Sequence, residues 1–351
     1  MQASQPKVSS HGRWTRPAMV FAFISVVGVF YAKWYPYYFK ALTTASSHSL
    51  GTSFVVGASG HPPSAGFHAA MSFFVAYFKD IWVALVVGIL VGAGVQTLLP
   101  KSWLYRILGR MSAKSRVLAV AAAVPSMMCT CCSSPIVVGM TKSRLSTGSA
   151  LAYWLANPVL NPATIIFMGF VLGWNWALLR IAMGLILVLG ASWVGDRWFT
   201  NGDSHEFDRQ VNPPADEPAT WQGFFRAAGR LVMGLIPEYI VIVALLGAVR
   251  VWLFPSVSPA VAHSLWLMVV LAVFGTIFVI PTAGEVPIVQ TLLGAGLGLG
   301  AGGALMMTLP AISLPSMAMV SAAMGKKEVL YVAGMVALAG LMTGLLALWL
   351  L

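Results

Sequence analysis

The sequence predicts an all-α protein that crosses a membrane several times. Hydrophobic residues make up 58% of its 351 residues and charged residues only 9%, and its mean hydropathy is +0.83, which excludes an ordinary soluble domain. Apolar runs at 81–99, 231–253 and 329–351 reach the roughly 20 residues that a helix needs to cross a bilayer. The net charge of +11 comes mostly from short loops between such runs, so we expect a lipid bilayer and no nucleic acid as partner.

The first helix is expected to start in the cytoplasm. Arg13 and Arg16 precede the first apolar run, and no small-residue cleavage site follows, which predicts an uncleaved helix over 17–32. The polar stretch 33–68 is then expected outside, and the apolar run 77–99 returns to the most basic loop of the chain. This loop, predicted to be cytoplasmic, carries Lys101, Arg106, Arg110, Lys114 and Arg116.

All three cysteines follow within four positions, Cys129, Cys131 and Cys132, with a proline on either side of the group. Proline removes a backbone donor and crowds the preceding turn, so segment 117–140 cannot be one unbroken helix. In lipid, broken backbone persists only where protein buries it or where it lines a water-filled cavity. Basic residues flank the segment on both sides and two full spans need roughly 40 residues, so we predict a re-entrant hairpin, with a single broken span as the alternative.

The rest of the chain alternates apolar runs with proline-rich breaks. A second break, Asn157-Pro-Val-Leu-Asn-Pro162, carries two asparagines, and a third lies between Pro281 and Pro287. The expected segments are, in order, 145–173, 177–194, a cytoplasmic linker at 196–220, then 231–253, 265–280, 288–299, 303–324 and a last span over 329–351 that carries the C-terminus outside.

A shift of 152 residues aligns the two halves. Pro135-Ile-Val falls on Pro287-Ile-Val, and a further proline follows each motif 23 residues later, Pro158 in the first half and Pro310 in the second. The charge pattern gives the halves opposite orientations, so we predict two inverted repeats whose broken helices meet near the membrane midplane, as in many secondary transporters. The expected units are an N-terminal helix and external segment (1–76), a first repeat (77–195), a cytoplasmic linker (196–230) and a second repeat (231–351).

The repeat predicts which residues form the solute site. The cysteines are expected to face Thr282, Gly284 and Glu285 across the pseudo-two-fold axis, and the asparagine break to face the break around Thr308 and Ser313. Thiolates bind soft ions and thiophilic solutes, so the sulfurs suit trivalent arsenic, Cu(I), Zn(II) or a sulfur-containing anion; the alternative is that they are small buried hydrophobes. The predicted substrate-binding residues are Cys129, Thr130, Cys131, Cys132, Asn157, Asn161, Thr282, Glu285 and Ser313, and the three cysteines are also candidate metal ligands.

Charged residues inside apolar runs are the remaining candidates. Glu285 and Glu238 are expected to face a cavity, where either could take up a proton and couple solute movement to the proton gradient; the alternative is a hydrogen bond that holds a hairpin. Arg180 and Arg250 are expected to extend to the outer interface. No P-loop pattern is present, so ATP hydrolysis is not expected, and no cofactor is predicted.

Two motifs resemble those of a known family. The cysteine-rich turn before Ser134-Pro135 and the stretch Leu155-Ala-Asn-Pro-Val-Leu-Asn-Pro162 are similar to the predicted permease family that includes the organoarsenical efflux permeases. The resemblance covers roughly residue 81 to the C-terminus. It implies a multi-pass inner-membrane transporter whose cysteines meet trivalent arsenic, with organoarsenical or metal efflux as the expected function. A thiol-redox or sulfur-handling enzyme, a transporter of a sulfur-containing anion, and a channel or receptor are the alternatives, and a homodimer is left open.

Overall fold

The computed structural model describes residues 11–51, 66–200, 219–253 and 264–351, and every regular element in these ranges is a helix. The first half contains α1 (His11–Val29), η1 (Phe30–Trp34), α2 (Tyr35–Ser47), α3 (Phe67–Thr97), α4 (Lys101–Leu108), α5 (Ala113–Ala123), η3 (Val124–Ser126), α6 (Thr130–Lys142), α7 (Thr147–Val159), α8 (Pro162–Val171) and α9 (Trp174–Thr200). The second half contains α11 (Trp221–Leu253), α13 (Leu265–Ile277), α14 (Glu285–Gly294), α15 (Leu299–Ala311), α16 (Leu314–Met324) and α17 (Lys326–Leu350). The predicted all-α class is confirmed.

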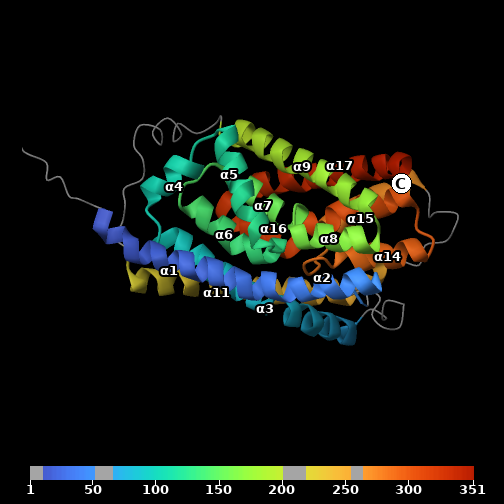
Figure 1. The fold of residues 1–351 in the computed structure, drawn as a ribbon, viewed down its shortest axis with the longest axis horizontal. Helices are drawn as coiled ribbons and strands as arrows, with labels where there is room; N and C mark the ends of the chain where they lie inside the picture. Colours follow the sequence, from blue (N-terminus) through green and yellow to red (C-terminus); the bar gives the residue numbers. More distant parts are fainter. Residues whose placement is uncertain (1–10, 52–65, 201–218, 254–263) are drawn as a thin grey trace, which may run out of the picture.

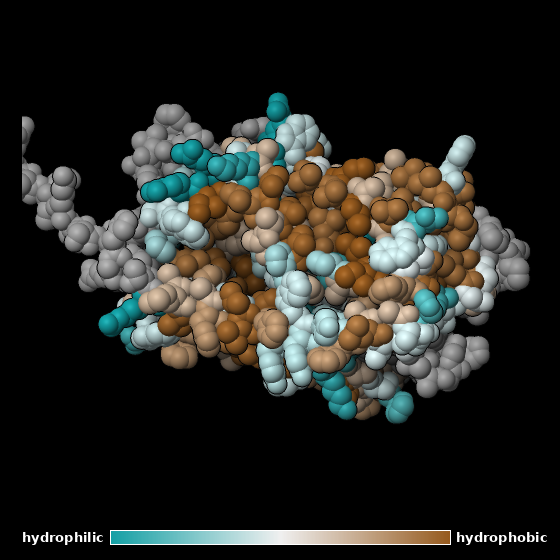
Figure 2. Space-filling model, viewed as in Figure 1, coloured by the Kyte–Doolittle hydropathy of each residue, from teal (hydrophilic) through white to brown (hydrophobic). Residues whose placement is uncertain are grey.

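The helices form an elongated bundle in which the start of α1 and α4 lie at one end and the C-terminus at the other (Figure 1). Within the described ranges, six helical segments are long and apolar enough to cross a membrane, or seven if the bent pair α15–α16 is one span. Figure 2 shows a broad apolar surface, with hydrophilic residues gathered at the end that carries α4. Large apolar side chains such as Val26, Trp193 and Trp266 are exposed on this bundle, as lipid-facing side chains are.

Two helices form the centre of the bundle. Nearly every residue of α7 and of α15 is buried, because both helices are apolar or small-residue helices on all sides. Each is surrounded by other helices, α7 by α5, α6 and α9, and α15 by α13, α14 and α17. The site described below lies where the breaks next to these two helices meet.

The N-terminal segment differs from the prediction. The first helix does not end at residue 32, because α1 continues through the π-helical turn η1 into α2, so that one helical segment reaches Ser47. Lys33 is inside this segment and buried, and its ammonium group donates a hydrogen bond to Thr282. The first part of the stretch 33–68 is therefore a continuation of the first helix, and residues 52–65 lie outside the described ranges. The external placement of this stretch stays a prediction.

Other helices are longer than predicted. The second span starts at Phe67 rather than at residue 77, and α9 continues to Thr200. Asp196, assigned to the linker, is instead buried inside α9, and α11 already starts at Trp221. Of the predicted linker, residues 201–218 lie outside the described ranges.

The helix boundaries repeat with the period that the prolines predict. The starts of α5 and α13, of α7 and α15, of α8 and α16, and of α9 and α17 are each 152 residues apart. The ends of α7 and α15, Val159 and Ala311, are also separated by 152 residues. This agreement supports the duplication, and the opposite orientation of the halves stays a prediction.

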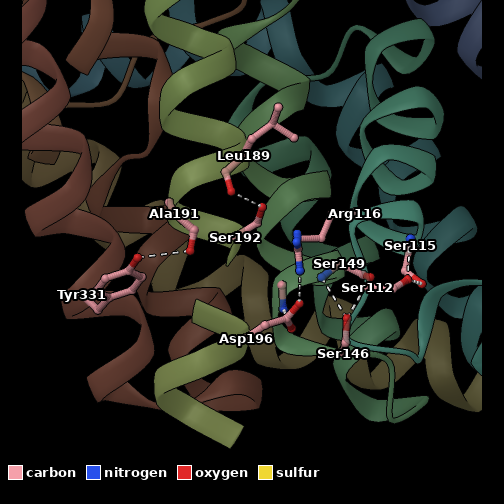
Figure 3. A network of polar contacts seen from close by, with 11 residues as sticks. Ser112, Ser115, Arg116, Ser146, Ser149, Leu189, Ala191, Ser192, Asp196 and Tyr331 are labelled. Carbon is pink, nitrogen blue, oxygen red and sulfur yellow. Dashed lines mark hydrogen bonds and ion pairs between the residues drawn. The ribbon is translucent and has the colours of Figure 1, made fainter. Parts of the chain in front are cut away.

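The two ends of segment 109–145 lie side by side. The backbone N–H of Ser146 donates to the carbonyl of Leu108 over 3.2 Å, so the chain that leaves α4 returns to the same place before α7. The start of α5 is joined to the end of α9 by an ion pair of 2.9 Å between Arg116 and Asp196, which also accepts a 2.6 Å hydrogen bond from Gly148 N–H (Figure 3). Such a return is what a re-entrant hairpin needs, and the hairpin itself stays a prediction.

The same end of the bundle holds the start of α17. The Tyr331 hydroxyl donates to the carbonyl of Ala191 over 3.1 Å, close to the Asp196 network (Figure 3). Three regions that the charge pattern assigns to the cytoplasm, at Arg116, Asp196 and the start of α17, therefore gather together.

This gathering makes the topology testable. In a cysteine-free background, we expect Ser112→Cys, Ser204→Cys and Lys326→Cys to resist a membrane-impermeant maleimide in intact cells and to react after the inner membrane is opened. Leu351→Cys at the other end of the bundle is the matched control and should react in intact cells. Labelling of any of the first three from outside would contradict the inverted arrangement.

Candidate functional site

The helix that carries the cysteines, α6, lies directly against the backbone of α3. Gly88 and Gly92 make this possible, because a Cβ atom at either position would collide with the carbonyl oxygen of Cys132 or of Pro135. The Ser134 hydroxyl donates a 2.7 Å hydrogen bond to the Thr130 carbonyl, so its donor is satisfied within α6. The cysteine turn is thus held on a rigid helix.

A break of the backbone precedes α6. Met127 adopts the left-handed conformation (φ 49°), which residues other than glycine rarely adopt, and Cys129 is the N-cap of α6. Asn157 holds this break from α7: its Oδ1 accepts from the Ser126 hydroxyl and, over 3.4 Å, from the Met128 N–H. Asn157 therefore supports the backbone next to the cysteines.

Asn161 has a similar role at the neighbouring break. It is the N-cap of α8, and its Oδ1 accepts hydrogen bonds from the N–H groups of Ala163 (3.1 Å) and Thr164 (3.3 Å). Both asparagines thus satisfy backbone groups that the breaks set free. The Nδ2 of Asn161 has no hydrogen-bond partner among the described residues.

The three cysteines do not converge on one point. The sulfurs of Cys129 and Cys132 lie 2.7 Å apart, whereas Cys131 lies 3.9 Å from the Tyr77 hydroxyl and 3.5 Å from the Ser313 hydroxyl. All three are buried and not disulfide-bonded. In the described part of the chain, no group of three or more His, Cys, Asp or Glu side chains could hold a metal ion. The geometry thus supports a pair of sulfurs rather than the predicted three-cysteine metal site.

A small cavity of about 10 Å³, roughly the room of one water molecule, lies at the cysteine turn. It is lined by residues of both halves: Met128, Cys129, Pro158, Thr164, Ile280, Pro281, Thr282, Ala283, Glu285 and Pro310. Three pairs among these, Met128 with Ile280, Cys129 with Pro281 and Pro158 with Pro310, are related by the same 152-residue shift. The two copies therefore meet at this cavity, and Cys129 lies with Thr282 and Glu285 as the repeat predicts.

The break around Thr308 and Ser313 lies near the asparagine break, because Pro158 and Pro310 line the same cavity. Ser313 caps α16 and lies beside the cysteine turn, with its hydroxyl 3.2 Å from that of Thr130. Thr308 bonds to the Ala304 carbonyl within α15 (2.9 Å) and packs against glycines of α13 and α17. Thr130 and Ser313 thus join the site, and Thr308 does not.

The prediction for Arg180 is wrong. Arg180 does not extend to an interface, because it is fully buried and its Nη1 lies 2.7 Å from Oε1 of Glu285. Its guanidinium also donates to the carbonyls of Pro158 (2.8 Å), Val159 (3.0 Å) and Met306 (3.4 Å). One arginine of α9 thereby joins α7, α14 and α15 beside the cavity. The side chains of Glu238 and Arg250, which carried two other predictions, lie outside the described residues.

A second cavity leads to the same turn from the side of the bundle. It has a volume of about 500 Å³, is almost entirely apolar, and is lined by residues of α1, α3, α4, α5 and α6. Pro125, Ser126 and Met128 of the cysteine break belong to its wall. Figure 2 shows the visible face hollowed between α1 and the region of α4 and α5. An apolar passage thus reaches the break from outside the bundle.

Comparisons with known proteins agree with this architecture. A family described as a predicted permease matches residues 66–348. The UPF0718 protein YraQ of Escherichia coli (strain K12) is 42% identical over 336 residues, which is 96% of each chain. The UPF0718 protein MJ0584 of Methanocaldococcus jannaschii is 21% identical over 334 residues, covering 76% of this chain and 91% of that protein.

No solved structure matches this chain. The family match spans α3 to α17 and therefore includes both breaks and both central helices, while α1, η1 and α2 lie outside it. The resemblance drawn from the cysteine turn and the asparagine motif is confirmed. This multi-pass membrane protein belongs to the predicted permease family.

Proposed function

We propose that this permease is a secondary transporter of the inner membrane that moves a small thiophilic solute through the cavity at the cysteine turn. One observation carries the proposal: Cys129 and Cys132 place two sulfurs 2.7 Å apart beside a cavity that both halves of the chain line. Two sulfurs this close can bind one soft atom together. The predicted permease family supports a transporter rather than an enzyme.

Transport through this site requires the halves to move. The cavity of about 10 Å³ is too small for a solute, so the helices around it separate when the solute binds or leaves. Inverted repeats provide such a movement, because rocking one repeat against the other opens a midplane site to one side and then to the other. The breaks before α6 and α14 are then the regions that move against each other.

Glu285 is the residue we propose for proton coupling. Its Oε1 is paired with Arg180, while its Oε2 accepts no hydrogen bond from the described residues and is the atom to which a proton would add. A proton on Glu285 would weaken the pair with Arg180 beside the cavity. Because Arg180 also holds α7 and α15, the change of charge would reach the centre of the bundle.

The solute class is tested by binding to purified protein. We expect at least one compound among trivalent arsenicals, Cu(I), Zn(II) and sulfur oxyanions to raise the melting temperature of the wild type but not of the Cys129→Ser/Cys131→Ser/Cys132→Ser protein. A ligand at one hundred times its Kd stabilises a folded protein by about 2.7 kcal/mol, which is readily measured. A compound that stabilises both proteins equally does not use the sulfurs, and the thiophilic proposal would then fall.

The paired sulfurs also favour one alternative, a membrane thiol-redox enzyme. The two cysteines are three positions apart at the start of a helix, an arrangement in which a thiolate is stabilised. Forming their disulfide would release two protons and pass two electrons to a quinone or to a partner disulfide. A mixed disulfide with a partner protein trapped by Cys132→Ser, without any solute transport by the wild type in proteoliposomes, would favour this alternative.

A further inference from the structure

The buried lysine of the N-terminal segment lies at the same site. Lys33 belongs to η1, outside the region that matches the family, and is only 3% exposed. Its Nζ donates a 2.9 Å hydrogen bond to Thr282 Oγ1, and Thr282 lines the cavity together with Cys129. The N-terminal segment therefore places an ammonium group at the cysteine turn.

The position of Lys33 is fixed by its neighbours on the same turn. The indole N–H of Trp34 donates to the carbonyl of Pro125 over 2.8 Å, directly before the cysteine break. The ammonium group of Lys33 lies 5.4 Å from the centre of the Tyr37 ring. A π-helical turn inserts one residue into the helix and often occurs at functional sites, and here it brings both Lys33 and Trp34 to the break.

Lys33 forms no ion pair with a carboxylate of the described residues, and Asp80 of α3 is a carboxylate on which its charge acts. Glu285, the only acid among the residues that line the cavity, is already paired with Arg180. A buried charge without an opposite charge destabilises the folded protein. Lys33 is close enough to Cys129 and Cys132 to stabilise negative charge there. Two cationic side chains, Arg180 and Lys33, and one carboxylate therefore lie beside the cavity.

The helices around the cavity also favour an anion. The first turns of α6 and α14 contribute Cys129 and Glu285 to it, whereas the N–H groups at the start of α8 are already bonded by Asn161. The free N–H groups and the dipole of a helix N-terminus favour an anion, and half-helices in transporters often point these ends at anionic solutes. Helix ends and lysine thus act in the same direction.

We propose that Lys33 completes an anion site at the cysteine turn and that the solute is an anionic sulfur compound. This inference rests on the proposed function in taking the cysteine turn as the solute site. The sulfurs contact the soft atom of the solute, while Lys33 and Thr282 hold its charged part. The N-terminal segment then determines which charge the permease accepts.

The test uses two probes that differ in charge. Thiosulfate is an anion with a soft sulfur atom, whereas arsenite is an uncharged acid at neutral pH. We expect Lys33→Met to weaken the binding of thiosulfate to the purified full chain about tenfold or more, and to leave the binding of arsenite unchanged. Lys33→Arg should keep thiosulfate binding, and Lys40→Met, a change of an exposed lysine on α2, should behave as wild type.

The stability of the ligand-free protein separates this role from a structural one. If Lys33 serves only to attach the N-terminal segment through Thr282, Lys33→Met will lower the melting temperature. A buried charge without an ion-pair partner predicts instead an unchanged or higher melting temperature, because a methionine of similar shape carries no desolvation cost. A lower melting temperature with unchanged thiosulfate binding would overturn the proposal.

Equal thiosulfate shifts in the wild type and in Lys33→Met, a zero shift in both included, would also overturn it. That result leaves the thiophilic function standing if arsenite still requires the cysteines. Conversely, loss of the cysteine requirement for every probe would remove the proposed function. The two ideas can therefore fail separately.

Discussion

Cys129→Ser and Cys132→Ser are each expected to abolish transport, whereas Cys131→Ser should only weaken it. The first two sulfurs lie 2.7 Å apart at the cavity, while Cys131 packs between Tyr77 and Ser313. Each tenfold loss of affinity corresponds to about 1.4 kcal/mol, and removing one sulfur of a pair should cost about two such steps. Uptake into proteoliposomes, with binding measured on the same preparations, provides the comparison.

The matched control for these cysteines is Ser133→Ala. Ser133 directly follows Cys132 on α6, is fully buried, and its hydroxyl donates to the Thr130 carbonyl of the same helix (3.1 Å). We expect this protein to transport as the wild type does. If Cys131→Ser caused the largest loss and the other two serine variants transported normally, the solute would not be held by the paired sulfurs.

Breaking the ion pair between Arg180 and Glu285 should have the largest effect on stability. Arg180→Met leaves a fully buried carboxylate without its cation and removes three contacts to backbone carbonyls, so we expect a loss of about 3–5 kcal/mol in the free energy of unfolding. Arg180→Met/Glu285→Met should recover part of it, since no charge then stays buried. Denaturant unfolding of the four proteins of this cycle measures the coupling.

Glu285→Gln is expected to behave differently from Arg180→Met. Arg180 keeps its bonds to Pro158, Val159 and Met306, so the helices around it stay joined and the protein folds. We expect passive solute exchange in proteoliposomes to persist and gradient-driven accumulation to be lost, because the residue can no longer take up or release a proton. Unchanged accumulation against a gradient would leave Glu285 with a purely structural role.

Proline positions and periodicity predicted most of the architecture. Pro135, Pro158, Pro287 and Pro310 mark helices next to the breaks and reveal the 152-residue repeat, because proline restricts the backbone wherever it lies. The cysteines were also informative, since three soft side chains within four positions at a break are unusual in an apolar chain. Local signals of this kind can be read without knowing what packs against them.

The charged residues of the site could not be placed in this way. Lys33 was expected to end the first apolar run, and Arg180 was expected to extend to the membrane interface. Both expectations assume that a charged side chain inside an apolar run has no hydrogen-bond or ion-pair partner in the protein. The partners are remote: Thr282 lies 249 residues from Lys33, and Glu285 follows Arg180 only in the other half of the chain. Cys131 likewise meets Tyr77 across 54 residues. Such pairs arise from tertiary packing alone.

The return of the chain from Leu108 to Ser146 has a consequence for biogenesis. Within that segment α5 has 11 residues and α6 has 13, each shorter than the roughly 20 needed to cross a bilayer. Neither can enter lipid alone, because the break between them would expose unpaired backbone groups to hydrocarbon. We therefore expect the segment to stay at the membrane surface during synthesis until α3 and the span formed by α7 and α8 are embedded and offer it a protein surface. Assembly in two stages is the expected outcome, with the long spans inserted first and the cysteine-bearing segment folded between them last.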